Sequence, residues 1–362
     1  VGMALFRILW GRSFQLSDSI IRATAAGNRI RAFAASTRGL VEEARARHNT
    51  SPVVTAALGR LLTAAAMMGA TLKREDERLT LRIEGDGPVK LLIAQSDAHA
   101  NVRGYAAEPC VLLGANEKGK LDVAGAVGKG FLRVTRQGAS GEPFTGTSEL
   151  VSGEIAEDLT YYYALSEQTP SAVALGVLMN HDNTVRAAGG FIIQLMPGAD
   201  EELIASLESR LAAMKPVSYL LADGATPEEL LRRALEGFDV AVNETIPTRF
   251  HCGCTRESVE RVLLSLGCKE LSTLAGKPVA HTHVPISTVR PFMLIFIFSA
   301  FMAINSVIAP AKPRQPASTI EFHGVSFMQR PFALQSSAHV SMSSMPMYFL
   351  LPFGLVIPFS IY

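Results

Sequence analysis

Between residues 17 and 197, alternating and continuous apolar runs predict a body that mixes strands with helices. Residues 30–35 and 79–84 have patterns typical of strands. Residues 89–95 follow the second of these across a four-residue connection with two glycines, which suits a tight turn. We therefore expect 79–84 and 89–95 to pair as a hairpin.

Two segments of the body have helical character. Residues 52–68 are rich in Ala, Leu and Met, and after the initial proline their only helix breaker is Gly59. Residues 155–168 begin with Glu157 and Asp158, and acidic side chains are favourable at a helix N-terminus. Both segments are predicted helices.

Two further buried strands are predicted at 172–179 and 186–195. The second contains Gly189 and Gly190, and glycines inside a strand indicate either a bulge or a close approach of another backbone. Strands and helices in this order predict an α+β fold, in which a mixed sheet carries packed helices.

After Pro197 and Gly198 the pattern becomes helical. Leu203, Leu207 and Leu211 recur at steps of four residues and form one apolar face. The run 226–229 reads Thr-Pro-Glu-Glu, which gives a second helix an N-cap, a proline at its first position and acids in its first turn. Short amphipathic helices need an apolar surface to pack on, so we expect a helical linker that depends on such packing.

The composition changes after Glu270. Of the 33 acidic residues only Glu321 lies beyond that point, together with half of the 12 methionines. This change predicts a non-cognate tail, as an out-of-frame reading, a fusion or an assembly error would produce. Residues 1–16 lack the pattern of a secretory signal and are interpreted as an upstream extension.

Bulk charge and cysteine content exclude several classes of function. The net charge is +1, from 34 basic and 33 acidic residues, so nothing in it favours nucleic acid or an anionic membrane as a partner. Four cysteines are too few and too unevenly spread for a secreted disulfide scaffold, and a reducing cytoplasm fits better. No nucleophile elbow and no dinucleotide fingerprint occurs, so we do not expect an enzyme.

The pair Cys252 and Cys254, separated by one glycine, is the place where thiols are set for joint chemistry. Two thiolates at this spacing can reach one zinc ion or be oxidised together. Thr255 is a good N-cap for a predicted helix over 256–266, whose dipole lowers the pKa of a nearby thiol. The alternative is that both cysteines are small buried apolar residues.

Cys268 lies at the far end of that predicted helix. At 1.5 Å per residue it is about 20 Å from Cys254, which exceeds the Cα separation of about 7 Å that a disulfide tolerates. Cys268 therefore cannot complete a site with the pair while the helix is formed.

Several short motifs follow one another along the chain: Gly27-Asn28-Arg29-Ile30-Arg31, Asn49-Thr50-Ser51-Pro52, Glu84-Gly85-Asp86-Gly87-Pro88, Gly104-Tyr105, Tyr161-Tyr162-Tyr163, Ser166-Glu167-Gln168-Thr169-Pro170, Ala188-Gly189-Gly190 and Cys252-Gly253-Cys254. In their order and spacing over residues 17–271, they resemble the heat shock protein 33 family. The resemblance implies an ATP-independent holdase chaperone for unfolding client proteins, with a body, a helical linker and a zinc module of four cysteines. Oxidation converts the cysteines of such a protein to disulfides, releases zinc and activates it, in some cases as a homodimer.

This chain departs from the family in one respect. The second pair, a C-x-x-C some thirty residues further on, is missing. His281 and His283 fall near its expected place and would share one face of a strand, but chance placement in the tail is the preferred interpretation. His251 is interpreted as a bystander. Zinc at Cys252 and Cys254 is therefore expected to be weak or absent, and their redox-active disulfide to be an impaired switch.

These observations divide the chain into five parts. We expect an N-terminal extension at 1–16, an α/β chaperone body at 17–198, a helical linker at 199–246, a partial zinc and redox module at 247–271 and the non-cognate tail at 272–362. The partial module is expected to be poorly ordered, because metal binding supplies much of the folding free energy of such modules.

Two other readings stay open. The cysteine pair could belong to a metal-binding interaction module of another kind. Alternatively, residues 291–309 are uncharged and nearly 20 residues long, which is enough for a membrane anchor if the tail is genuine.

Overall fold

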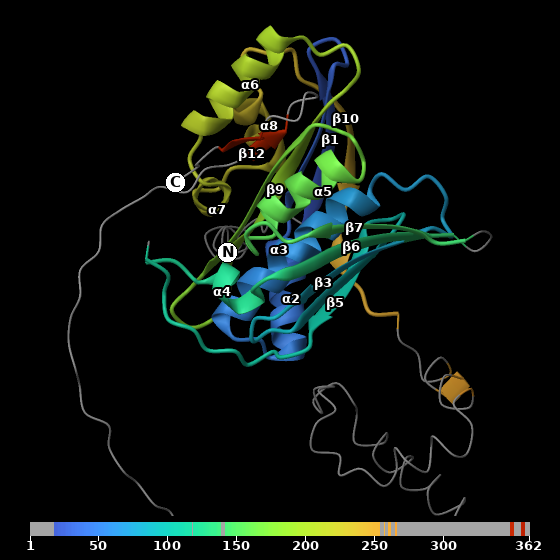
Figure 1. The fold of residues 1–362 in the computed structure, drawn as a ribbon, viewed down its shortest axis with the longest axis vertical. Helices are drawn as coiled ribbons and strands as arrows, with labels where there is room; N and C mark the ends of the chain where they lie inside the picture. The colour runs from blue at the N-terminus through green and yellow to red at the C-terminus, as the bar shows by residue number, and fades with distance from the viewer. Residues whose placement is uncertain are drawn as a thin grey trace, which may run out of the picture.

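The computed structural model describes residues 18–117, 119–138 and 142–253, the helical positions 257, 260, 261 and 265, and the paired strands Tyr348–Leu350 (β12) and Val356–Pro358 (β13). The main part consists of four layers: three helices, a five-stranded sheet, three more helices and a six-stranded sheet (Figure 1). An α+β fold is thereby confirmed. The predicted extension at 1–16 and the proposed membrane span at 291–309 lie outside the described residues.

The five-stranded sheet is antiparallel throughout and has the order β10-β1-β2-β9-β8. Its strands are Ser19–Ala25 (β1), Ile30–Ser36 (β2), Ser171–Met179 (β8), Val185–Leu195 (β9) and Ala241–Pro247 (β10). The three predicted strands of this sheet, over 30–35, 172–179 and 186–195, are confirmed. Both faces are covered by helices over much of their area, which explains the nearly continuous apolar run of β9.

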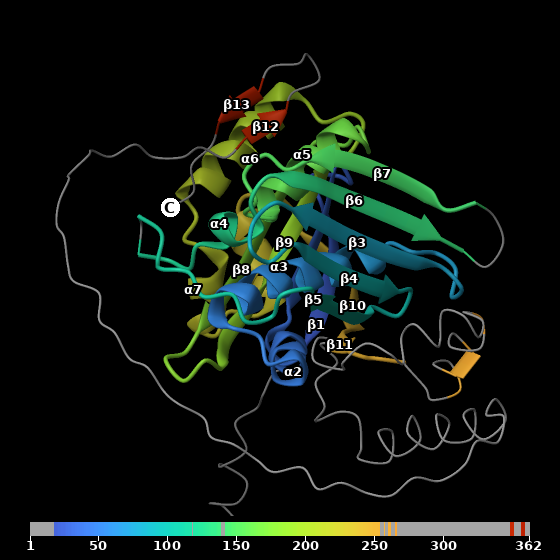
Figure 2. The same cartoon turned by 60° about the horizontal axis from the view of Figure 1, so that its bottom comes forward.

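The six-stranded sheet has the order β11-β5-β4-β3-β6-β7 and is mixed, because β11 runs parallel to β5 (Figure 2). Its strands are Arg78–Gly85 (β3), Leu91–Asp97 (β4), Asn101–Ala106 (β5), Gly130–Gln137 (β6), Phe144–Glu149 (β7) and Arg249–Phe250 (β11). The predicted hairpin is confirmed as β3 and β4, although β4 begins two residues later than expected. Alternate residues of β3 and β4 are buried, so this sheet has one apolar face and one face in solvent.

Helix α3 (Pro52–Gly69) lies between the two sheets and contacts strands of both. Pro52 occupies its first turn, where a missing N–H costs nothing, and the helix that follows is buried on almost every side. Within the described residues α3 is the one helix whose length and hydropathy would also suit a membrane, but 89% of that stretch is buried inside this fold. It is the core helix of the body.

Two helices flank α3 in the same layer, α2 (Arg38–His48) and α5 (Ala156–Leu165). Each begins at a buried or half-buried carboxylate. The Asp18 carboxylate accepts hydrogen bonds from the backbone N–H groups of Gly39 and Leu40 at 3.1 and 2.5 Å. The Asp158 carboxylate accepts hydrogen bonds from four backbone N–H groups just before α5. The acid predicted at this helix N-terminus therefore stabilises it. Helix α4 (Val123–Val127) is a short cover at the end of α3.

For Gly189 and Gly190 in β9 the sequence predicted either a bulge or a close approach of another backbone, and the structure shows the close approach. A Cβ atom on Gly189 would lie 2.3 Å from the carbonyl oxygen of Ala35, and one on Gly190 would lie 2.3 Å from that of Ala174. The register to β2 and β8 runs through both glycines without a shift. Close backbone approach, and not a bulge, therefore requires these glycines.

Helices α6 (Glu201–Ala213), α7 (Val217–Ala222) and α8 (Pro227–Ala234) cover the outer face of the five-stranded sheet. Leu203, Leu207 and Leu211 are buried in a second apolar cluster with residues of β1, β2 and β9. The helices predicted after Gly198 and after Thr226 are thus confirmed, and both pack on an apolar surface. The linker is not helical throughout, however, because its last residues form β10, an edge strand of the body.

Candidate cysteine site and its attachment to the body

The candidate site follows the last edge strands of the two sheets. The chain leaves β10 at Pro247, passes Thr248, forms β11 and reaches Cys252, which is exposed. Cys254 and Cys268, as well as His281 and His283, lie outside the described residues. The structure therefore places one member of the predicted cysteine pair, at the end of a segment that is attached to the body.

Thr248 fixes the start of this attachment. Its backbone N–H donates to the carbonyl oxygen of Asp18 at 3.1 Å, and its hydroxyl donates to the carbonyl oxygen of Ala100 at 2.7 Å. The residue is buried, so the removal of its hydroxyl would leave a carbonyl in a place that water reaches poorly. Thr248 thus joins the beginning of β1 to the beginning of β5.

Phe250 is the apolar part of the attachment. Only 9% of its surface is exposed, and its ring packs edge-on against the imidazole of His48 with the ring centroids 6.2 Å apart. The guanidinium of Arg47 lies 5.6 Å from the Phe250 centroid, within the range of a cation–π contact. The next residue, His251, donates its backbone N–H to the carbonyl oxygen of Val102 at 2.7 Å.

The surroundings of His48 favour the neutral form of its ring. Burial lowers the pKa of His48, and the positive charge of Arg47 lowers it further, while a hydrogen bond with the backbone of Gly104 opposes both effects. A neutral imidazole packs against a phenyl ring without a buried charge. The Phe250 attachment is therefore an apolar contact at the C-terminal end of α2.

Within the described residues, this segment contributes one thiol, that of Cys252. A structural zinc ion takes four ligands, usually thiolates and imidazoles. In the part of the chain that the structure describes, no three His, Cys, Asp or Glu side chains are grouped to hold a metal ion. We therefore derive no step through zinc.

The prediction of poor order over 247–271 is wrong for the first residues of that range, 247–250. Pro247 ends β10 and Arg249–Phe250 form β11, while residues 254–271 are described only at four isolated helical positions. Cys110, the other described thiol, is exposed in a turn, and Leu112 behind it is 84% exposed.

Sequence reasoning missed the attachment formed by Thr248, Phe250 and β10. A signal for β10 exists, because Val242, Thr245 and Ile246 are β-branched residues of high strand propensity. A two-residue strand such as β11 carries no periodicity that a sequence pattern could reveal.

Comparison with known proteins identifies the fold and the family together. A sequence model described as Hsp33 protein matches residues 18–282. The chain belongs to the Hsp33 family. This match reaches eleven residues into the stretch that we expected to be non-cognate, so the family resemblance extends further than the motifs indicated.

Curated Hsp33 relatives cover the same part of the chain. A protein of Lachnoclostridium phytofermentans named 33 kDa chaperonin is 54% identical over 266 residues, which are 73% of this chain and 91% of that protein. The 33 kDa chaperonin of Bacillus subtilis strain 168 is 48% identical over 71% of this chain and 88% of its own length. These names support a chaperone function.

A solved structure supports the same conclusion for the fold. The crystal structure of the 33 kDa chaperonin (heat shock protein 33 homolog) of Thermotoga maritima aligns with a TM-score of 0.67 at 41% identity. The alignment covers 73% of this chain and 92% of the Thermotoga chain.

Proposed function

We propose that this chain is an ATP-independent holdase that binds unfolding proteins and prevents their aggregation. The observation that carries this proposal is its membership of the Hsp33 family over nearly the whole length of relatives that are named chaperonins. A holdase needs surface and no catalytic constellation, so no residue is assigned to catalysis and no enzyme activity is proposed. The clients are unfolded polypeptides, recognised by apolar surface and backbone.

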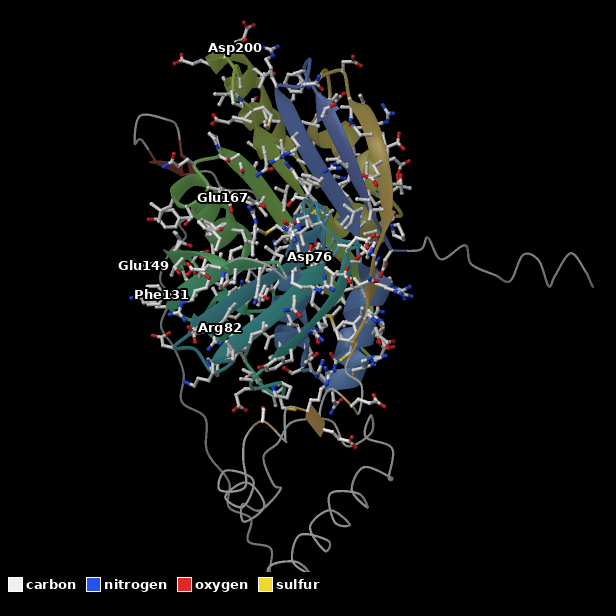
Figure 3. All side chains as sticks on the ribbon, turned by 90° about the vertical axis from the view of Figure 1, so that its right-hand side faces the viewer. Asp76, Arg82, Phe131, Glu149, Glu167 and Asp200 are labelled. Carbon is white, nitrogen blue, oxygen red and sulfur yellow. The ribbon has the colours of Figure 1, made fainter. Side chains whose placement is uncertain are left out.

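The body offers several exposed apolar side chains for this purpose. The outer face of the six-stranded sheet bears Phe131 and Tyr105, each 45% exposed, beside the ion pairs of Glu84 with Arg82 and Arg133. Figure 3 labels Phe131 and Arg82 on this sheet. Such scattered apolar groups are ordinary on a monomer, and a contiguous client surface requires more. We therefore place the gating of activity elsewhere, in the segment that leads to Cys252.

Cys252 and Cys254 are proposed as a redox-active pair with an impaired switch. With peroxide, the two thiols would lose two protons and two electrons to form one disulfide, while the peroxide is reduced to two molecules of water. A disulfide across a single intervening residue is strained and forms less readily. Two thiolates also supply only half of a zinc site, so zinc would be held weakly or not at all.

Activity should consequently be largely constitutive. A weakly folded cysteine module contributes little stabilisation to the residues that precede it. The protein is proposed to act in the cytoplasm, with unfolded clients and with a second copy in the active state as partners, and without nucleic acid.

The test is suppression of client aggregation by the full chain, measured by light scattering in reductant and after peroxide, with and without ATP. We expect the same suppression under all four conditions. Strong activation by peroxide that Cys252→Ser abolishes would show that the switch works and that the gate is not impaired. Cys110→Ser is the matched control, because it removes another exposed thiol far along the chain from the pair.

Metal content is measured on the same preparation. We expect zinc to be lost to a strong chelator in proportion to the chelator added, without a change in suppression. Zinc retained stoichiometrically would contradict the half-site, and replacement of His281 and His283 would then show whether these residues complete it.

A further inference from the structure

One continuous stretch, residues 241–250, lies along an edge of both sheets, and we refer to it as the strap. Its first part, β10, pairs antiparallel with β1, and after Thr248 its second part, β11, pairs in parallel with β5. In Figure 3 the strap is the gold ribbon that runs beside the blue strand β1. Cys252 follows two residues after the strap ends.

The β10 part of the strap is held lightly by its side chains. All of its residues except Ile246 are exposed. Glu244 forms an ion pair with Arg22 at 3.2 Å, and both side chains are at the surface, where such pairs contribute about 0–1 kcal/mol. The ladder passes from Glu244 opposite Arg22 to Val242 opposite Ala23, which leaves Asn243 without a β1 residue opposite it.

The space under the middle of β10 is polar. An open hollow of about 520 Å³ is lined by Arg22, Ala23, Thr24, Arg31, Asn243 and Glu244. Around this hollow the strap lies against charged and polar groups, so the hydrophobic effect, which scales with buried apolar area, contributes little there. The apolar contact of β10 itself is that of Ile246, which is half-buried against the main core.

The firm attachment lies at the other end of the strap, next to the cysteine. Thr248 and Phe250 are buried, and His251 donates a backbone hydrogen bond to β5. Any change in the chain beyond His251 acts first on this attachment. Once Phe250 leaves its place against Arg47 and His48, the strap is held by the β10 backbone ladder, the two hydrogen bonds of Thr248 and a few side-chain contacts.

We propose that the strap is displaceable and that an extended segment of an unfolding protein takes its place on the edge of β1. This inference rests on the proposed holdase function and names the way in which a client is bound. An edge strand presents unpaired N–H and C=O groups to any chain that can become extended, and such pairing is a known mode of peptide recognition. Because the strap's own β10 side chains point largely into solvent, pairing there selects for backbone and not for sequence. That suits a protein that must hold many different clients.

The direct test is hydrogen exchange of the full chain, followed by mass spectrometry. Backbone amides of β1 that bond to β10 should exchange through opening of the strap, and an excess of unfolding client should slow them again. Amides of β2, which is an interior strand, serve as the internal reference because neither the strap nor a client pairs with them.

Two variants loosen the strap by independent means. Phe250→Ala removes the apolar attachment, and we expect β1 exchange to rise by a factor of roughly 5 to 30, as for a loss of one to two kcal/mol. Glu244→Arg places like charges opposite Arg22 at the surface, where it cannot prevent folding, and should raise exchange about fivefold. Both should suppress aggregation at a lower ratio of chain to client.

Glu228→Arg is the matched control for Glu244→Arg. It makes the same change of charge and breaks an exposed ion pair, here with Arg232 in α8. It weakens a linker helix and leaves the strap untouched, so β1 exchange and suppression should stay at the level of the unchanged chain. If Glu228→Arg and Glu244→Arg increase suppression equally, general loosening of the linker is the cause, and the proposed displacement of the strap is wrong.

A peptide with the sequence of residues 241–250 provides the competition experiment. It should compete with client for the Phe250→Ala variant, and the same peptide methylated on alternate backbone nitrogens should not. If client aggregation is suppressed but β1 amides stay unprotected and the peptide has no effect, this inference fails while the holdase function stands. If no condition yields suppression, both fail.

Discussion

Helix α3 and the strap are held in opposite ways. The side chains of α3 are enclosed between two sheets, and Leu61 and Leu62 have no exposed surface. The strap is an edge, exposed along most of β10 and buried only at Thr248 and Phe250. One region is stabilised by packing on nearly every side, and the other by a local attachment beside the exposed Cys252. A chaperone gains from this difference, because the segment can leave while the body keeps its fold.

The linker helices α6, α7 and α8, like α3, are held by packing on a sheet of the body. Leu203, Leu207 and Leu211 pack on the five-stranded sheet, so the support of these helices in the described structure is the body itself. The residues through which the cysteine segment is seen to contact the body are those of the strap and its attachment, which makes the strap the element that a change at Cys252 reaches first.

The largest expected effect comes from truncation inside the body. Leu61→Ala removes a fully buried side chain between two sheets and should lower the free energy of unfolding by about 2–5 kcal/mol. Urea denaturation of the full chain, followed by circular dichroism, measures it. A loss below that range would show that the space around α3 can collapse and that the body is less rigid than its packing indicates.

Leu231→Ala makes the same chemical change in α8, where the side chain is equally buried but faces one sheet only. We expect Leu231→Ala to lower mainly the free energy of local opening of α6, α7 and α8. It should shift the main unfolding transition less than Leu61→Ala does. Hydrogen exchange resolved along the chain separates the two regions. Uniformly faster exchange of α3 and α8 would mean that body and linker open as one unit.

A smaller effect is expected at the N-terminus of α8. The Thr226 hydroxyl accepts from the N–H of Glu229 at 3.2 Å, and the Glu229 carboxylate accepts from the N–H of Thr226 at 2.8 Å. Thr226→Ala should cost about 1 kcal/mol, seen as faster exchange over 227–234. Thr226→Ser keeps the cap and should leave exchange unchanged.

The smallest effect is a dependence on pH. Burial raises the pKa of Glu42, but hydrogen bonds from Arg45 and from the N–H of Val185 outweigh it and hold that pKa below its ordinary value. A depressed carboxyl pKa stabilises the fold above the pKa of the unfolded state, and this stabilisation is lost as pH falls through the folded pKa. The full chain should therefore be slightly more stable than Glu42→Gln at neutral pH, by less than about 1 kcal/mol, and the two should converge towards pH 3. Parallel curves from neutral to acid pH would contradict this assignment.

Local patterns predicted those parts of the fold that are long and periodic. The helix over 52–68, the hairpin and the paired apolar strands all follow from residue spacing and turn chemistry, because their burial is expressed in their own sequence. The end of α5 at Leu165, three residues before the expected end, is the usual fraying of a boundary. The family, too, was recognisable from short motifs in a fixed order.

Sequence patterns did not predict the contacts between residues that lie far apart in the chain. The partners of Thr248 are Asp18 and Ala100, and no pattern within 241–250 indicates either of them. The β10 strand was missed because a helical trend up to Ala234 was extended to 246, although β-branched residues pointed to a strand. For the candidate site, the sequence indicated the thiols and their chemistry but not the aromatic contact that ties Cys252 to α2.

The order of the strands also has a consequence for synthesis on the ribosome. Strand β1 leaves the ribosome first, yet its outer partner β10 comes late, since 222 residues separate Arg22 from Glu244. At translation rates of about 5–20 residues per second, the β1 edge stays uncovered for roughly 10 to 45 s in every new copy. During that interval the β1 edge of the nascent protein is unpaired. A neighbouring nascent chain on the same polysome is near enough to pair with this edge in place of β10.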